Sequence, residues 1–216
     1  MPNMRVDKNS MPAQEPGVRN KNFQEVALGY PEDVALDEAA RCLNCKHKPC
    51  VQGCPVRIDI PVFIKKINEG DFEAAYQVIS EASSLPAVCG RVCPQESQCE
   101  KVCVRGIKNE PVGIGRLERF VADWHFEHTD GAVEAPQKNG HRVAVIGSGP
   151  AGLACADALS RKGHRVTVFE RADRPGGFLM YGIPNMKLDK HVIETRIELL
   201  KCQGVTFQLN CNVGEN

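Results

Sequence analysis

Eight cysteines form the pattern in this sequence that is most suggestive of chemistry. The chain has eleven cysteines, and eight of them lie between Cys42 and Cys103 in two groups. The first group reads CLNCKHKPCVQGCP from Cys42, and the second reads CGRVCPQESQCEKVC from Cys89. Thiols at this density are typical of metal ligands, catalytic groups or disulfides. Their spacing helps to choose among these.

Three kinds of cysteine site compete for the two groups. Disulfides need an oxidising compartment, and the N-terminal MPNMRVDKNS has no apolar signal segment. Structural zinc usually takes two C-x2-C knuckles, and only Cys42 and Cys45 have that spacing. A cubane cluster takes three thiolates from one loop and a fourth from elsewhere, and in bacterial ferredoxins the cysteine before proline ligates the neighbouring cluster. Iron–sulfur clusters are therefore favoured, with zinc as the alternative.

The Cys-Pro pairs predict how two clusters would share their ligands, because each pair carries its cysteine away from the preceding loop. The ligands predicted for the first cluster are Cys42, Cys45, Cys50 and Cys103. Those predicted for the second include Cys54, Cys93 and Cys99. The cysteine count does not decide whether Cys89 or a carboxylate completes the second set.

Helices are expected on both sides of these loops. Apolar residues recur at helical spacing after Pro31, after Asp59 and after Gly113. The expected helices cover residues 32–41, 60–70, 72–82 and 114–127. Residues 1–30 show no period and are predicted to form an extended arm, so that 31–127 is the helical, cluster-bearing domain.

The character of the sequence changes after a turn-rich stretch at 128–140, which we predict to be a linker. Residues 142–146 and 165–169 are short β-branched runs, and an Ala/Leu helix is predicted over 150–162. This strand, helix and strand form one βαβ unit. We expect residues 141–216 to be a Rossmann-like domain.

A glycine fingerprint joins the first strand to its helix. Its six residues are Gly147, Ser148, Gly149, Pro150, Ala151 and Gly152, and they form a G-x-G-x-x-G. The glycines permit a tight turn and a close approach to a pyrophosphate at the helix N-terminus. Glu170 ends the second strand, where an acid binds a ribose 2′-hydroxyl and disfavours NADP, although Arg171 is a contrary hint. A further glycine approach at Gly177 and Phe178 favours FAD over NAD.

Composition narrows the function classes further. Lys+Arg and Asp+Glu each number 27, so the formal net charge is zero. No global positive field exists to attract nucleic acid or an anionic membrane surface, and we expect a cytoplasmic protein. Cys155, Cys202 and Cys211 lie outside the two groups and are expected to pack as small apolar side chains in or near a core.

The quoted motifs, with EPVGIGRLERFVADW, VFER and PGGFLMYGIPNMKLDK, resemble a known family over nearly the whole chain. The chain is similar to the N-terminal part of the small, or beta, subunit of NADPH-dependent glutamate synthase. The wider family includes ferredoxin:NADP oxidoreductase large subunits, sulfide dehydrogenase alpha subunits and the N-terminal half of dihydropyrimidine dehydrogenase. The implied fold is α+β, with an N-terminal all-α iron–sulfur domain followed by an incomplete α/β Rossmann-like FAD-binding domain.

The resemblance implies an electron conduit in which NADPH reduces FAD and two 4Fe-4S clusters pass electrons to a partner. It also implies an oxygen ligand for the second cluster at Glu118, a residue that the helical pattern alone would make a solvated charge, and leaves Cys89 a non-ligand. Lys187 and Val213 match FAD-contacting positions, and Val92 is expected at the flavin edge. No catalytic side chain is assigned.

The expected partner is the large FMN/iron–sulfur subunit of glutamate synthase, or an equivalent redox partner. A bifurcating ferredoxin:NADP oxidoreductase or a sulfide dehydrogenase subunit is the redox alternative, and a zinc or scaffold module is the alternative of another class. Family subunits are much longer than this chain, and their NADPH site has no counterpart here. We therefore expect weak FAD binding and no NADPH oxidation by this chain alone.

Overall fold

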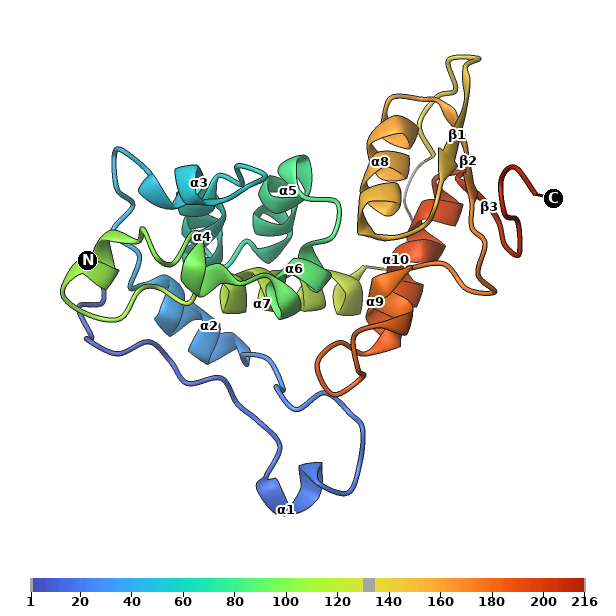
Figure 1. Ribbon diagram of the computed structural model, residues 1–216. Helices are drawn as coiled ribbons and strands as arrows, with labels where there is room; N and C mark the ends of the chain where they lie inside the picture. Colours follow the sequence, from blue (N-terminus) through green and yellow to red (C-terminus); the bar gives the residue numbers. More distant parts are fainter. Residues whose placement is uncertain (1, 130–134, 216) are drawn as a thin grey trace. The chain divides into compact units, whose positions relative to one another are not determined.

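The computed structural model describes residues 2–129 and 135–215, and it divides into two compact units (Figure 1). The first unit contains the chain up to Asn22 and Val26–His128. The second contains 23–25 and the chain from Thr129 onward. A helical unit followed by a Rossmann-like unit confirms the α+β expectation at this level. The predicted linker at 128–140 falls partly on 130–134, which lie outside the described residues.

The regular elements of the first unit are helices, apart from one isolated β-bridge between Ala13 and Ala27 in the described residues. Its elements are α1 (Pro16–Arg19), α2 (Glu32–Ala39), α3 (Pro49–Gly53), α4 (Ile60–Asn68), α5 (Phe72–Ala82), α6 (Pro86–Val92), η1 (Gln95–Ser97), η2 (Val104–Ile107) and α7 (Ile114–His128). Short 3₁₀ turns and loops separate α6 from α7 and carry part of the second cysteine group. The bounds of α5 coincide with those predicted. Those of α2, α4 and α7 agree to within two residues.

The core of this unit forms around α7, which buries the apolar stripe expected from the sequence. Leu117 and Val121 are fully buried on it. Phe120 meets Phe72 of α5 edge-on, with ring centroids 5.2 Å apart. Phe63 of α4 is also buried in the same core. This core fixes the helices from which the cysteine loops emerge.

The N-terminal arm, predicted to be extended, is mostly irregular but contains the short helix α1 and is tied to the helical unit. Arg41 is fully buried and donates a hydrogen bond from Nη2 to the Val6 carbonyl at 3.0 Å. Its Nη1 pairs with Glu38 Oε1 at 2.6 Å. The arm lacks helical period, yet its carbonyls satisfy a buried guanidinium, which explains why an irregular segment is held in place.

The second unit contains a three-stranded parallel sheet in the order β1-β2-β3. Its elements are β1 (Arg142–Ile146), α8 (Pro150–Arg161), β2 (Arg165–Phe169), α9 (Phe178–Tyr181), α10 (Lys190–Cys202) and β3 (Thr206–Gln208). Both predicted strands have their predicted bounds, and Val143 pairs with Val166. The carboxyl ends of β1 and β2 are therefore adjacent, which brings the glycine turn beside Glu170.

The expectation that the three isolated cysteines pack in a core is wrong for two of them. Cys155 and Cys202 are exposed, and Cys211 is half-buried. Cys155 lies on α8, whose buried face carries Leu153 and Ala156 instead. Helical phase, which a residue type does not reveal, decides the exposure of Cys155.

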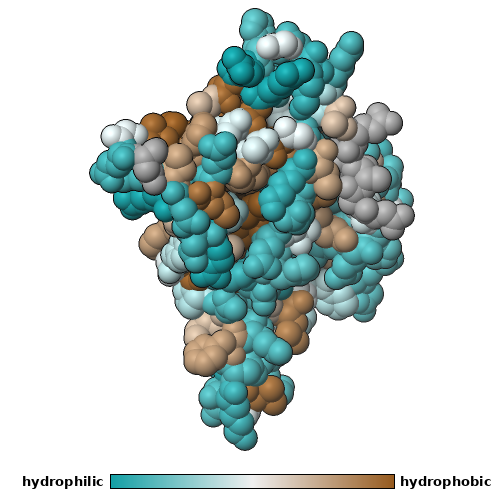
Figure 2. Space-filling view, turned by 90° about the vertical axis from the view of Figure 1, so that its right-hand side faces the viewer, coloured by the Kyte–Doolittle hydropathy of each residue, from teal (hydrophilic) through white to brown (hydrophobic). Residues whose placement is uncertain are grey.

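None of the helices within the described residues is both long and apolar enough to cross a membrane. On the face that Figure 2 shows, hydrophilic residues predominate and apolar residues lie among them in scattered groups. Single apolar side chains on a surface are normal in folded proteins.

Candidate cluster and dinucleotide sites

The first cysteine pocket gathers thiols from both cysteine groups. Its cysteines are Cys42, Cys45, Cys50 and Cys103. Cys42 follows α2 closely, Cys50 lies in α3, and Cys103 lies directly before η2. The pocket wall is otherwise mainly apolar, and it includes Ile60, Pro61, Ile64, Val112 and Ile114. One buried charged residue, Arg105, also lines it.

The second cysteine pocket, a cavity of about 190 Å³, gathers the other four. Its cysteines are Cys54, Cys89, Cys93 and Cys99. Glu118 of α7 lines the same cavity. Each pocket thus contains the cysteines that the Cys-Pro pattern pairs, and the ligation of iron stays a prediction. Among the described residues, no three Cys, His, Asp or Glu side chains converge as a single metal ion would require.

Burial is the main influence on the pKa of several of the thiols in these pockets. It raises the pKa of Cys50 and of Cys89 to about 12, with smaller contributions from neighbouring thiols and, at Cys89, from Glu118. Burial also raises the pKa of Cys42 and Cys93 above the ordinary thiol value. Thiolates are the form that binds iron, and a buried thiolate needs a compensating cation. The pockets therefore suit thiols that ionise only when a positively charged core is bound.

Glu118 is buried, which overturns the solvated reading that its helical position suggests. Its exposed fraction is 6%, and burial raises the pKa of its carboxyl to about 8. Its Oε1 has no hydrogen-bond partner among the residues that the structure describes. A buried polar atom without a partner needs an explanation, and a bound metal ion or cluster is one. Cys89, in contrast, lies 4.0 Å from the Ser83 hydroxyl, which is oriented to donate to its sulfur. The donor set of this pocket fits an iron cluster.

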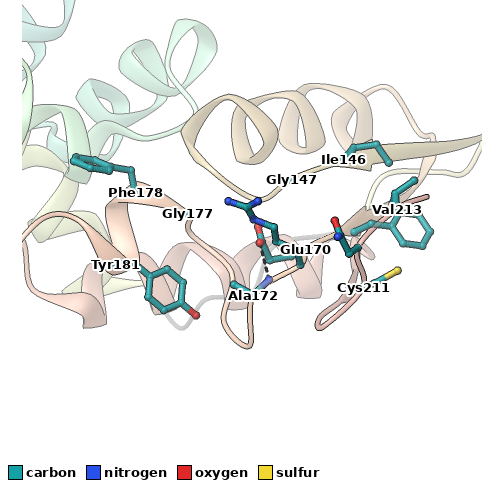
Figure 3. Close-up of a pocket in the computed structure, with 12 residues that line it drawn as sticks. Ile146, Gly147, Glu170, Ala172, Gly177, Phe178, Tyr181, Cys211 and Val213 are labelled. Atoms are coloured by element: carbon teal, nitrogen blue, oxygen red, sulfur yellow. Dashed lines mark hydrogen bonds between the residues drawn. The ribbon is translucent and has the colours of Figure 1, made fainter. Parts of the chain in front are cut away.

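The second unit contains a cavity of about 540 Å³ at the carboxyl ends of β1 and β2 (Figure 3). It is lined by Ile146, Gly147, Phe169, Glu170, Arg171, Ala172, Gly177, Phe178, Tyr181, Cys211, Asn212 and Val213. In Figure 3, Ile146 and Val213 lie on one side of Glu170, and Phe178 and Tyr181 lie on the other. A crevice at this edge of a parallel sheet is where dinucleotides bind.

Two glycines of the turn leave open space beside the backbone that a side chain would otherwise fill. Gly147 has φ +89°, and a Cβ on Gly147 or Gly149 would meet nothing within 4 Å. A Cβ on Gly152 would instead come 2.0 Å from the Gly147 carbonyl oxygen. Gly177, with φ +52°, approaches Gly149 so closely that a Cβ would lie 2.8 Å from its Cα. The open side above Gly147 and Gly149, at the N-terminus of α8, fits a pyrophosphate.

Glu170 organises this turn as well as facing the cavity. Its Oε2 accepts hydrogen bonds from the Ser148 amide, at 2.9 Å, and from the Ser148 hydroxyl. Its Oε1 accepts from the Ala172 amide at 2.9 Å (Figure 3). Burial acts to raise the pKa of Glu170, but these hydrogen bonds and Arg171 outweigh it, so the pKa lies below the ordinary value. The carboxylate is therefore ionised at neutral pH and retains lone pairs for a ribose hydroxyl.

The remaining predicted contacts are distributed unevenly. Ser148 is fully buried, and its hydroxyl accepts from the Gly176 amide, so its side chain does not line the cavity. Pro150 and Ala151 are exposed in the first turn of α8. Lys187 is exposed and is not among the cavity residues. Val92 ends α6 in the helical unit, half-buried.

Several residues that line the cavity beside Glu170 were not predicted from the sequence. Tyr181 and Asn212 come from segments without a strand or fingerprint signal, and Cys211 was expected only as packing. Arg171, considered above only as a hint against the exclusion of NADP, is exposed but lines the cavity. Its position beside Glu170 was the available signal. Arg105 had no signal beyond its nearness to Cys103.

Two family models match the chain. The model described as dihydropyrimidine dehydrogenase domain II, 4Fe-4S cluster, matches residues 19–130. The model described as an NAD(P)-binding Rossmann-like domain matches residues 145–196. The first match covers the helices and both cysteine groups, and the second covers the glycine turn and Glu170.

Curated relatives are similar over nearly all of this chain. The glutamate synthase (NADPH) small chain of Escherichia coli is 40% identical over 215 residues, which cover 98% of this chain and 44% of that one. The small chain of Bacillus subtilis is 38% identical, with the same coverage. Glutamate synthase (NADH) of Saccharomyces cerevisiae is 41% identical over 94% of this chain and 10% of its own length. The chain spans less than half the length of these relatives.

Proposed function

This chain belongs to the dihydropyrimidine dehydrogenase domain II family of 4Fe-4S proteins, and we propose that it is the electron-transfer part of a glutamate synthase small subunit. Electrons from NADPH would pass through FAD in the second unit to two 4Fe-4S clusters in the helical unit and on to a partner. The observation that carries the proposal is the division of eight cysteines between two pockets, four in each.

The helical unit would hold the clusters through seven thiolates and one carboxylate. Cys42, Cys45, Cys50 and Cys103 would bind the first cluster, and Cys54, Cys93, Cys99 and Glu118 would bind the second. The orphaned Oε1 of Glu118 supports this choice over Cys89, whose sulfur has a hydroxyl neighbour. The apolar walls exclude water, which protects the clusters and strengthens the charge interactions around them.

The second unit would bind FAD in the cavity beside Glu170. The turn from Gly147 to Gly152 and the N-terminus of α8 would take the pyrophosphate, and Glu170 would accept a hydrogen bond from the ribose. Phe178 and Val213 line the cavity as apolar contacts. When bound, FAD takes up two electrons as a hydride and releases them singly, as iron–sulfur clusters require.

The partner in this proposal is the large FMN/iron–sulfur subunit of glutamate synthase, which would use the electrons to form glutamate from glutamine and 2-oxoglutarate. Support comes from the names of the relatives, two of which are small chains of glutamate synthase. The yeast relative is named for NADH rather than NADPH, so the choice of NADPH as donor rests on the bacterial small chains.

Metal, sulfide and flavin analysis after anaerobic purification tests the proposal. We expect brown protein with equal amounts of iron and acid-labile sulfide, two separable clusters in redox titration, and FAD released on denaturation. Zinc without sulfide would refute the redox function and favour a scaffold module. Iron and sulfide for only one cluster would refute the two-pocket assignment.

A further inference from the structure

We propose that Arg105 sets the reduction potential of the cluster in the first pocket by donating a hydrogen bond from its Nε to a sulfur of that cluster. The inference rests on the proposed function, because it requires a cluster on Cys42, Cys45, Cys50 and Cys103. It adds a positioning residue to a site otherwise described only by its ligands.

The side chain of Arg105 is placed for this role by the helical unit. The residue lies in η2, two positions after Cys103, and lines the same pocket as the four cysteines. Its exposed fraction is 4%. Its Nη2 donates to the Arg5 carbonyl of the N-terminal arm, and its Nη1 lies 3.5 Å from the Met4 sulfur. The arm therefore holds the two terminal nitrogens of the guanidinium.

The third nitrogen of the guanidinium, Nε, has no such contact with the described residues. Arg105 Nε is buried and has no hydrogen-bond partner within residues 2–129 and 135–215. A buried donor that meets neither water nor protein destabilises the fold, and does so more strongly when the group is charged. The pocket that Arg105 lines contains four thiols, whose sulfurs become acceptors once they are ionised.

Comparison with the other buried arginines supports the same assignment. The buried arginines of the described chain are Arg41, Arg105, Arg119 and Arg196. Arg41 pairs with Glu38, Arg119 with Asp123 and Arg196 with Asp157. Arg105 alone among the four forms no ion pair with a carboxylate in the described part of the chain. Buried charges are normally paired, so an anionic occupant of the first pocket is the partner this arginine needs.

The expected consequence concerns electron affinity. Thiolates give the loaded site a net negative charge, which increases when the cluster accepts an electron. A nearby guanidinium stabilises the reduced state more than the oxidised one, and hydrogen bonds to cluster sulfurs act in the same direction. Arg105 therefore raises the potential of the first cluster. Glu118 lines the second pocket, and no buried arginine is among the described residues of its wall.

Redox titration followed by electron paramagnetic resonance tests this on the full chain with both clusters loaded. In Arg105→Gln, the ratio of reduced to oxidised first cluster at a fixed applied potential should fall about tenfold, because the variant loses a charge and a hydrogen bond that together favour the reduced state over the oxidised one by an amount on the order of one hydrogen bond to a charged group. For a one-electron couple that fall is a shift of about 59 mV to lower potential. Arg105→Lys keeps the charge and should shift the potential less. The second cluster should not change in either variant.

Arg196→Lys is the matched control, because Arg196 is also a buried arginine but lies on α10 in the second unit and does not line the pocket. Lysine at that position keeps a charge for Asp157, and the first potential should stay at its wild-type value. An unchanged potential in Arg105→Gln, or an equal shift in Arg196→Lys, would overturn the proposal. Loss of the first cluster from both Arg105 variants would make the residue a folding element and also overturn it. A wild-type chain without clusters would instead refute the proposed function.

Discussion

Removal of the Glu170 carboxylate should damage the dinucleotide unit in two measurable ways. The carboxylate accepts three hydrogen bonds from protein donors, two of them from buried Ser148 and one from the Ala172 amide. Hydrogen bonds to a charged group contribute about 1.5–3 kcal/mol each, and such contributions within one network do not add fully. We therefore expect Glu170→Ala to lower the free energy of unfolding by roughly 3–5 kcal/mol.

Glu170→Gln should lower the stability less than Glu170→Ala, because the amide oxygen still accepts hydrogen bonds. Some loss should remain, because the NH2 group faces a donor and cannot accept from it. Both variants should also bind FAD about tenfold more weakly, since the ribose loses a charge-assisted acceptor. Scanning calorimetry of the second unit's transition and a flavin fluorescence titration measure the two effects. The matched control is Glu198→Gln, which removes an exposed carboxylate paired with Lys201 on α10. Exposed pairs contribute at most about 1 kcal/mol, so this control should remain near wild type.

The pH dependence of the same group has a definite sign. Because the folded pKa of Glu170 lies below its unfolded value of about 4.3, its contribution is fully present above that pH and is lost as the pH falls through the folded pKa. Glu170→Gln should flatten this part of the stability curve. If Glu170→Ala matched Glu198→Gln in both unfolding and FAD affinity, the role assigned to Glu170 would be wrong.

Four further variants probe the remaining contacts. Glu118→Ala should remove or alter one cluster signal, with loss of up to about half of the iron. Cys89→Ala should keep the iron content near that of the wild type. Loss of a whole cluster from Cys89→Ala would reverse the choice of Glu118 over Cys89 as ligand. Gly152→Ala should unfold or displace the glycine turn and weaken FAD binding, because its Cβ would come 2.0 Å from the Gly147 carbonyl oxygen. Wild-type FAD affinity in this variant would contradict the close packing described. Gly177→Ala should weaken FAD binding without changing iron content, because its Cβ would lie 2.8 Å from Gly149 Cα. An unchanged FAD dissociation constant would count against a role for Gly177 in bringing the backbone close to FAD.

Local patterns predicted the elements around the sites well. The strands at 142–146 and 165–169 are short β-branched runs bounded by glycine and charge, so period and punctuation agree. The helix at 72–82 has an Asp71 side chain that caps the Ala74 amide and a buried apolar face. Such features depend on neighbouring residues, which is why a single sequence reveals them.

Long-range contacts were harder to predict. The arm around Arg5 and Val6 has no period, and its order depends on Arg41, which is distant in sequence. The burial of Glu118 follows from the packing of α7 against the cysteine loops, and only resemblance to a family singled the residue out. Helical phase likewise placed Cys155 outside the core. Residue type and spacing do not determine these outcomes, because each depends on how separate elements meet.

The division of cysteines between two clusters is the central claim, and paired cysteine variants test it most directly. Cys50→Ser and Cys103→Ser lie far apart in sequence but line one pocket, whereas Cys99→Ser alters the other. Electron paramagnetic resonance of the reduced, iron-loaded chain should lose the same signal in Cys50→Ser and Cys103→Ser and a different signal in Cys99→Ser. Loss of different signals in Cys50→Ser and Cys103→Ser, with Cys103→Ser resembling Cys99→Ser, would contradict the account.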